Sequence, residues 1–132
     1  MSVERVGIQA THQEMPSSHA SVVTVSGELD LYSLNEFKKV LAEAEDTQSS
    51  LIILDLRELG FIDSSGLGAI IGVQGRCQKS SRSLFVVVLP DSALLKTFEV
   101  TGLDEIFRLI ESPEEALPSS GLETVDSKTP LL

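Results

Sequence analysis

Cysteine, histidine and basic residues are scarce in this sequence, and each scarcity excludes a class of protein. One cysteine, Cys77, occurs in 132 residues, so no internal disulfide and no zinc site of several cysteines can form. His12 and His19 are the two histidines, and we interpret both as incidental residues of a polar N-terminal loop. The 10 basic residues face 20 acidic ones, and the net charge of −10 argues against a nucleic-acid-binding protein.

Long apolar runs and targeting segments are also missing. No apolar stretch approaches the ~18 residues that a membrane-spanning helix requires. The first residues do not show a basic segment followed by an apolar one, the pattern of a secretory signal. We therefore expect a protein of the reducing cytoplasm without membrane association. Cys77 falls near the apolar side of a predicted helix, where a buried and unreactive thiol is expected.

The length and the order of the predicted elements indicate one α/β domain. A chain of 132 residues is long enough for a single sizeable core, and no repeat is visible. We expect the domain over 1–117 and a disordered tail over 118–132, where the composition turns polar and rich in turn-forming residues. Strands are predicted over 3–10, 22–25, 51–56, 83–89 and 106–110, with helical patterns over 34–44, 67–77 and 92–101.

This alternation predicts a mixed, mostly parallel sheet with helices packed against it. The first two strands would form an initial hairpin across a loop at Thr11–Ser18. Ser33 and Glu36 have the spacing of a capping box for the first helix. Asp91 or Ser92 is predicted to cap the last helix, and Gly102 to end it.

The stretch 51–78, LIILDLRELGFIDSSGLGAIIGVQGRCQ, is the centre of the chain. A buried strand turns at Asp63, Ser64 and Ser65, where a helix is about to begin. The first turn of a helix leaves N–H groups unpaired and carries partial positive charge. An oxygen-bearing side chain can cap these donors, and a phosphate on such a side chain would also be accommodated. A capping role and a modification site are compatible here.

Glycines are frequent in this predicted helix, although each costs up to about 1 kcal/mol relative to alanine. Gly68, Gly72 and Gly75 fall on one stripe, which we interpret as close packing of the helix against a neighbouring element. Gly66 is interpreted differently. Beside two serines it would leave the start of the helix bare, so that another molecule could approach Ser64 closely.

The segment FIDSSGLGAIIG, preceded by LIILDLREL and followed by VTGLDEIF, resembles the STAS domain family, specifically the bacterial anti-sigma factor antagonists. The resemblance includes GELD at 27–30 and runs from about Val3 to Leu117. It implies a mixed sheet with helices packed against it. It also implies that Ser64 is phosphorylated by a partner kinase, with Ser65 as the fallback acceptor.

The resemblance further implies a partner-switching function. The unphosphorylated protein would bind an anti-sigma factor, usually itself a serine kinase, and so free the sigma factor. Phosphorylation of Ser64 would end this binding, and a serine phosphatase would reset the protein. Glu28 and Asp30 could form a catalytic carboxylate pair, but no histidine or third acidic residue is placed to complete a site, so we interpret them as solvated loop charges. The resemblance implies that they can instead be part of the partner surface. The partner-binding residues expected are Glu28, Asp30, Asp63, Ser64, Ser65, Gly66 and Leu67.

Two other functions stay open at this point. One is a non-switching STAS module of a transporter or scaffold assembly. The other, with less support, is an enzyme that uses Ser64 as a nucleophile. It would require a base and an orienting group, but histidine is scarce and no Gly-x-Ser-x-Gly elbow or phosphate-binding loop is present. We therefore expect no enzyme, no catalytic residue, no metal and no cofactor.

Overall fold

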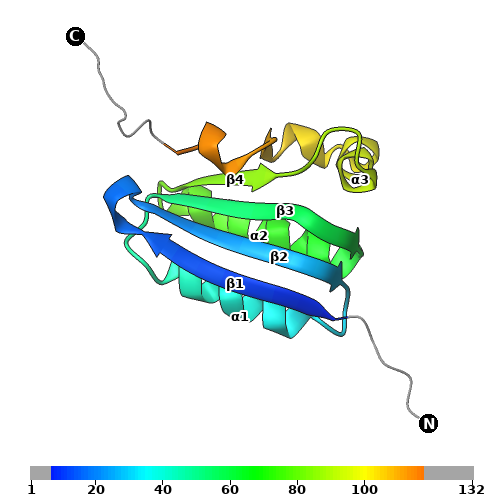
Figure 1. The fold of residues 1–132 in the computed structure, drawn as a ribbon, viewed down its shortest axis with the longest axis horizontal. Helices are drawn as coiled ribbons and strands as arrows, with labels where there is room; N and C mark the ends of the chain where they lie inside the picture. The colour runs from blue at the N-terminus through cyan, green and yellow to red at the C-terminus, as the bar shows by residue number, and fades with distance from the viewer. Residues whose placement is uncertain (1–6, 118–132) are drawn as a thin grey trace.

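An antiparallel hairpin forms one edge of a five-stranded sheet, and the remaining strands run parallel to its second strand (Figure 1). The computed structural model describes residues 7–117. The spatial order of the strands is β1-β2-β3-β4-β5. The predicted fold class, an α/β domain with an initial hairpin and a mixed, mostly parallel sheet, is therefore confirmed. The elements are β1 (Ile8–Met15), η1 (Pro16–Ser18), β2 (Ala20–Leu29), α1 (Leu34–Glu45), β3 (Leu51–Ile62), α2 (Ser64–Lys79), β4 (Ser83–Val87), α3 (Ala93–Thr101), η2 (Leu103–Glu105), β5 (Arg108–Ile110) and η3 (Pro113–Glu115).

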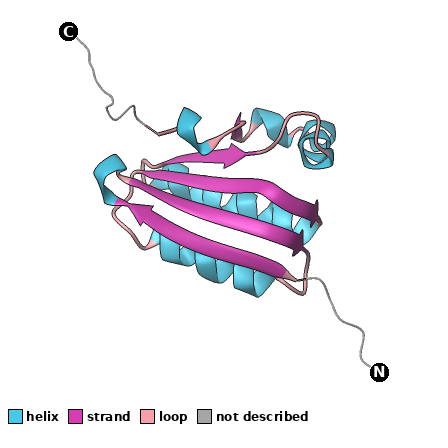
Figure 2. Cartoon of the chain, viewed as in Figure 1, coloured by secondary structure: helices cyan, strands magenta, loops and turns pink. Residues whose placement is uncertain are grey.

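The core lies between the sheet and the helices, with α1 and α2 side by side behind β1, β2 and β3 (Figure 2). Alternate residues of each strand point to this layer, because successive side chains of a strand face opposite sides. In β3 these are Ile52, Leu54 and Leu56, all essentially inaccessible to solvent. The helices contribute the side chains of Phe37, Leu41, Ile70, Val73 and Phe98.

The first hairpin differs from its prediction in position. Residues 11–15, predicted as loop, continue β1, and the turn is confined to η1 and His19. The polar side chains of residues 11–15 led to the prediction of a loop. In the structure β1 and β2 pair in an unbroken register from Ile8 opposite Gly27 to Met15 opposite Ala20. His12 is thus a strand residue with a partly buried side chain, whereas His19 lies in the exposed turn as expected. The predicted strand residues 3–6 and the predicted tail 118–132 lie outside the described residues.

The boundaries of α3 follow the sequence pattern closely. Ser92 caps α3 by accepting a hydrogen bond from the Leu95 N–H, and Gly102 ends the helix with a positive φ of 77°. Both features were predicted. β2 and β3 are longer than expected because they pair with each other beyond their apolar stretches, through register shifts near Ser26 and Glu28.

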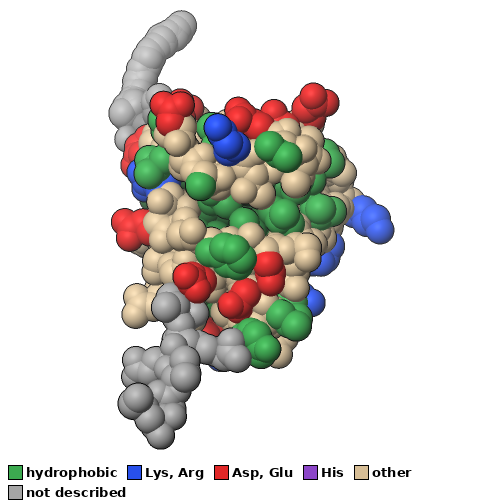
Figure 3. Space-filling view, turned by 90° about the vertical axis from the view of Figure 1, so that its right-hand side faces the viewer, with side chains coloured by type: hydrophobic (Ala, Val, Ile, Leu, Met, Phe, Trp, Pro, Cys, Tyr) green, Lys and Arg blue, Asp and Glu red, His purple; other side chains and the backbone are tan. Residues whose placement is uncertain are grey.

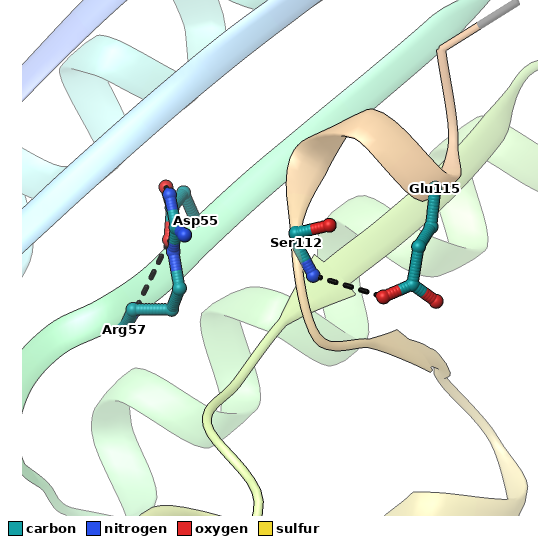
Figure 4. A network of polar contacts seen from close by, with 4 residues as sticks. All are labelled: Asp55, Arg57, Ser112 and Glu115. Carbon is teal, nitrogen blue, oxygen red and sulfur yellow. Dashed lines mark hydrogen bonds and ion pairs between the residues drawn. The ribbon is translucent and has the colours of Figure 1, made fainter.

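A charged pair lies on the sheet face that points away from α1 and α2. Asp55 on β3 is 6% exposed, and its two carboxylate oxygens accept hydrogen bonds from the Arg57 guanidinium at 3.0 and 2.8 Å. The hydrogen bond to Asp55 raises the pKa of Arg57. Figure 4 shows this pair and, beside β3, the turn η3, in which the Ser112 N–H donates to Glu115. A short helical turn, η3, thus follows Ser112.

Candidate functional site

Two loops meet where β2 and β3 end. These strands are parallel neighbours, so their carboxyl ends lie at the same edge of the sheet, with Glu28 opposite Phe61 and Leu29 opposite Ile62. The Asp63 N–H donates to the Leu29 carbonyl oxygen at 3.0 Å and extends this pairing. The loop after β2 and the start of α2 are therefore adjacent, and Figure 3 turns this end of the molecule toward the viewer.

Asp63 caps α2. Its backbone is extended, and its Oδ1 accepts hydrogen bonds from the N–H groups of Ser65 at 2.9 Å and Gly66 at 3.2 Å. The predicted helix start at these residues is confirmed, and the cap is Asp63. Ser64 is the first helical residue, and its side chain is exposed. Within residues 7–117 its hydroxyl has no hydrogen-bond partner and is open to another molecule.

The cap changes what the helix start can offer a phosphate. The N–H groups of Ser64, Ser65 and Gly66 have no partner within the helix, and Asp63 already occupies two of them. The Asp63 carboxylate also places a negative charge beside Ser64. A phosphate on Ser64 would therefore find fewer free donors than a bare helix start provides, contrary to the expectation from sequence.

Gly66 is buried against the ends of β2 and β3. A Cβ atom at this position would lie 2.7 Å from Leu29 Cγ and 2.8 Å from Ile62 Cγ1. The interpretation of Gly66 as an opening for an approaching molecule is therefore wrong. The residue allows the first turn of α2 to approach the sheet closely.

The later glycines have the opposite role from the one predicted. A Cβ atom on Gly68 or Gly75 would meet no atom within 4 Å, and one on Gly72 would meet only the Arg76 guanidinium, at 3.2 Å. Close packing therefore does not explain this stripe. Gly68 and Gly72 instead line an open groove of about 560 Å³ between α1 and α2.

The loop after β2 is held by its own polar side chains. Asp30 Oδ1 accepts hydrogen bonds from the N–H groups of Tyr32 at 3.0 Å and Ser33 at 3.1 Å. The Ser33 hydroxyl donates to the Glu28 carbonyl oxygen at 2.9 Å and accepts from the Asp30 N–H at 3.0 Å. Ser33 therefore does not cap α1 with its side chain, and the predicted capping box with Glu36 does not form.

Asp63 also joins this loop to α2. Its second carboxylate oxygen, Oδ2, accepts a hydrogen bond from the Leu31 N–H at 3.2 Å. Leu31 and Tyr32 are 65% and 70% exposed, and Phe61, at the end of β3, is 49% exposed. Sequence reasoning did not assign these three residues to the site, although an apolar pair inside a polar loop was a visible signal.

The predicted site residues are thus brought to one end of the molecule, with different roles. Hydrophobic and acidic side chains lie next to one another on this end (Figure 3). Ser64 is exposed, Ser65 and Leu67 are half-buried, and Gly66 is buried. Glu28 is half-buried, and its carboxylate makes no hydrogen bond within residues 7–117. No three histidine, cysteine or acidic side chains in this part of the chain are grouped to hold a metal ion.

Comparison with known proteins assigns the fold. The sequence model of the STAS domain matches residues 10–116. The chain belongs to the STAS domain family. The anti-sigma-B factor antagonist of Staphylococcus aureus (strain NCTC 8325 / PS 47) is 29% identical to this STAS protein over 92 residues, which cover 70% of this chain and 84% of the relative.

Solved structures show the same fold in proteins of different description. An anti-sigma factor antagonist from Mycobacterium paratuberculosis superposes with a TM-score of 0.72 at 23% identity, covering 83% of this chain and 90% of that one. The Bacillus cell fate determinant SpoIIAA in its phosphorylated form superposes with a TM-score of 0.56 at 25% sequence identity, covering 83% of this chain and 95% of that one. A sulfate transporter family protein from Wolinella succinogenes superposes with a TM-score of 0.60 at 22% sequence identity, covering 79% of this chain and 86% of that one.

None of the helices within residues 7–117 has the length and hydrophobicity that a membrane-spanning helix requires.

Proposed function

We propose that this STAS protein is an anti-sigma factor antagonist that is switched by phosphorylation of Ser64. In its unphosphorylated form it binds an anti-sigma factor, itself a serine kinase, and so frees a sigma factor in the cytoplasm. Phosphorylation ends the binding, and a serine phosphatase restores it. The protein acts by binding and is not itself an enzyme. The antagonist relatives and the match of the STAS domain model to residues 10–116 support this proposal.

The observation that carries the proposal is the exposed Ser64 hydroxyl at the start of α2. It has no hydrogen-bond partner within residues 7–117, so esterification would break no contact of the fold. Ser65 is half-buried and lines the groove between α1 and α2, so it is the less accessible fallback. SpoIIAA, a solved structure with a similar fold, is described in a phosphorylated form, which supports the proposal of a phosphorylated residue on this fold.

The switch acts at the interface and leaves the fold intact. A phosphate adds about −1.5 to −2 charges at neutral pH. It would lie beside the Asp63 carboxylate, on a surface that the partner covers in the complex. A loss of about 2–3 kcal/mol there weakens binding by roughly two orders of magnitude. An exposed phosphate on free protein stays hydrated and does not disturb the core.

The test is to incubate the protein with ATP and its kinase and to locate the phosphate by mass spectrometry. We expect it on Ser64. The Ser64→Ala variant should fold and bind the kinase constitutively, whereas Ser64→Asp should fold and bind poorly. A phosphate on another residue, or equal affinities of the two variants, would contradict the proposal.

A non-switching STAS module is the second candidate, because a sulfate transporter family protein shares this fold. The two functions differ in a simple measurement. A non-switching module would bind its partner with the same affinity whether position 64 carries Ser, Ala or Asp.

A further inference from the structure

We propose that Asp63 is a positioning residue for the partner surface: it clamps the Leu31–Tyr32 loop to the start of α2, so that these two side chains form a single contact surface with Ser64. The proposal rests on the function proposed above and adds residues that the family resemblance did not supply. The partner it predicts presents an apolar hollow to Leu31 and Tyr32, with basic side chains at its margin.

The geometry of the Asp63 carboxylate is the first argument. One oxygen caps α2 through the N–H groups of Ser65 and Gly66, and the other accepts from the Leu31 N–H at 3.2 Å. Capping alone requires a single oxygen. Ser92 demonstrates this in the same protein, because it caps α3 with its one hydroxyl. The second oxygen of Asp63 therefore serves the contact between the loop and the helix.

The internal order of the loop is the second argument. Asp30 accepts from the N–H groups of Tyr32 and Ser33, and the Ser33 hydroxyl reaches back to Glu28. The loop is thus a hydrogen-bonded unit, and a contact at Leu31 fixes the whole of it. Asp63 supplies that contact from the helix that begins with Ser64.

The third argument is the exposure of the residues so positioned. Leu31 and Tyr32 are adjacent and are 65% and 70% exposed, and exposed apolar side chains that lie together are a feature of contact surfaces. Interfaces obtain most of their affinity from a few such anchors inside a polar margin. Here the neighbouring side chains include Glu28, Asp30 and Asp63, in a chain of net charge −10. A partner with basic residues at the margin is therefore complementary.

The experiment separates the clamp from the cap. Asp63→Asn keeps a good capping oxygen but places an amide N–H₂, which cannot accept, where Oδ2 was. Two properties are measured: amide hydrogen exchange at Leu31 in the free protein, and the dissociation constant for the kinase that phosphorylates Ser64. We expect faster exchange at Leu31 and binding weakened by about tenfold, the lower end of what one lost hydrogen bond to a charged group costs.

A double-mutant cycle tests whether Asp63 acts through the loop. Leu31→Ala removes the apolar anchor, and Asp63→Asn should then cost much less than it does in the wild-type protein. Additive losses would overturn the proposal, because Asp63 would then contact the partner directly or act elsewhere. A matched control is Ser49→Ala, which breaks a buried 2.8 Å hydrogen bond to Ser21 at the opposite end of the sheet and should leave the affinity unchanged.

The remaining outcomes are also decisive. Unchanged exchange at Leu31 in Asp63→Asn overturns the clamp without reference to any partner. Faster exchange with unchanged affinity overturns the role of the loop in binding, while the effect of Ser64→Asp would still support the proposed switch. If the wild-type protein is neither bound nor phosphorylated by a serine kinase, the proposed function fails and the partner surface with it.

Discussion

Gly66 lies so close to Leu29 that a single added carbon would collide with it. A Cβ atom at Gly66 would be 2.7 Å from Leu29 Cγ, a separation that real Cβ contacts do not show. The first turn of α2 is therefore seated directly on the end of β2. This contact fixes how far Ser64 projects from the sheet.

Two alanine substitutions in α2 should have opposite effects on stability. Gly66→Ala is expected to lower the free energy of unfolding by about 1–3 kcal/mol, because Leu29 and Ile62 must move. Gly68→Ala meets no atom and should raise it by up to about 1 kcal/mol through better helix propensity. Urea denaturation measures both. Equal shifts in the two variants would show that the seating of Gly66 is looser than described.

Asp30 should contribute to the stability of the fold, whereas the Glu28 carboxylate should not. Asp30→Ala leaves the N–H groups of Tyr32 and Ser33 without their acceptor and should cost about 1–2 kcal/mol. Glu28→Gln should change stability by less than about 0.5 kcal/mol, as surface substitutions usually do. Thermal unfolding of both variants is the measurement. A neutral Asp30→Ala would mean that the loop is ordered by other contacts.

The two arginine–carboxylate pairs found within residues 7–117 should contribute unequally to stability. Asp55 has a side chain only 8% exposed, so Arg57→Ala removes both guanidinium hydrogen bonds from a nearly buried carboxylate and leaves it the N–H of residue 57 at 3.1 Å. This loss should cost about 1–3 kcal/mol. Arg76 pairs with Glu45 at 2.6 Å, but its own side chain is 58% exposed. Arg76→Ala should therefore cost less than about 1 kcal/mol. The prediction fails if chemical denaturation ranks the two variants in the reverse order.

Cys77 should be unreactive in the native protein and should make stability depend on pH. The thiol is buried, and burial raises its pKa. In the unfolded chain the thiol ionises near pH ~8.5. Above that pH the unfolded state loses a proton that the folded state keeps, so stability should decrease as pH rises. Cys77→Ala should reduce this dependence.

Alkylation provides the direct measurement for the same residue. Iodoacetamide at pH 8 should modify Cys77 slowly in native protein and rapidly in urea, as read by intact mass. Rapid modification of the native protein would show that the C-terminal half of α2 opens readily.

The elements that sequence predicted well are those with strong local patterns. The apolar run after Leu51 defines the first half of β3, and the Asp63-Ser64-Ser65 turn defines the start of α2, without any other part of the chain. β1 was misplaced because IQATHQEM is largely polar, and only its pairing with β2 shows that it is a strand. The propensities of neighbouring residues carry no information about which strand pairs with a segment.

The site was predicted in composition but not in the roles of its residues. Ser64 was proposed from its place at a helix start together with the family resemblance. The interpretations of Gly66 and of the later glycines were the reverse of what the structure shows. Gly66 packs against Leu29 of β2 as well as Ile62, and Gly68 and Gly75 have no atom near a Cβ position, neither of which local sequence reveals. The contact of Asp63 with Leu31 was missed for the same reason, since it joins two loops from different parts of the chain.

The spatial order β1-β2-β3-β4-β5 repeats the order of the strands in the chain. Each strand therefore finds the preceding one already in place when it leaves the ribosome, and the sheet can grow at one edge during synthesis. No later strand has to insert between two earlier ones. Until β4 emerges, however, the apolar β3 is an open edge, so a pause in translation while β3 is outside the ribosome and β4 is still inside it would expose the nascent chain to aggregation.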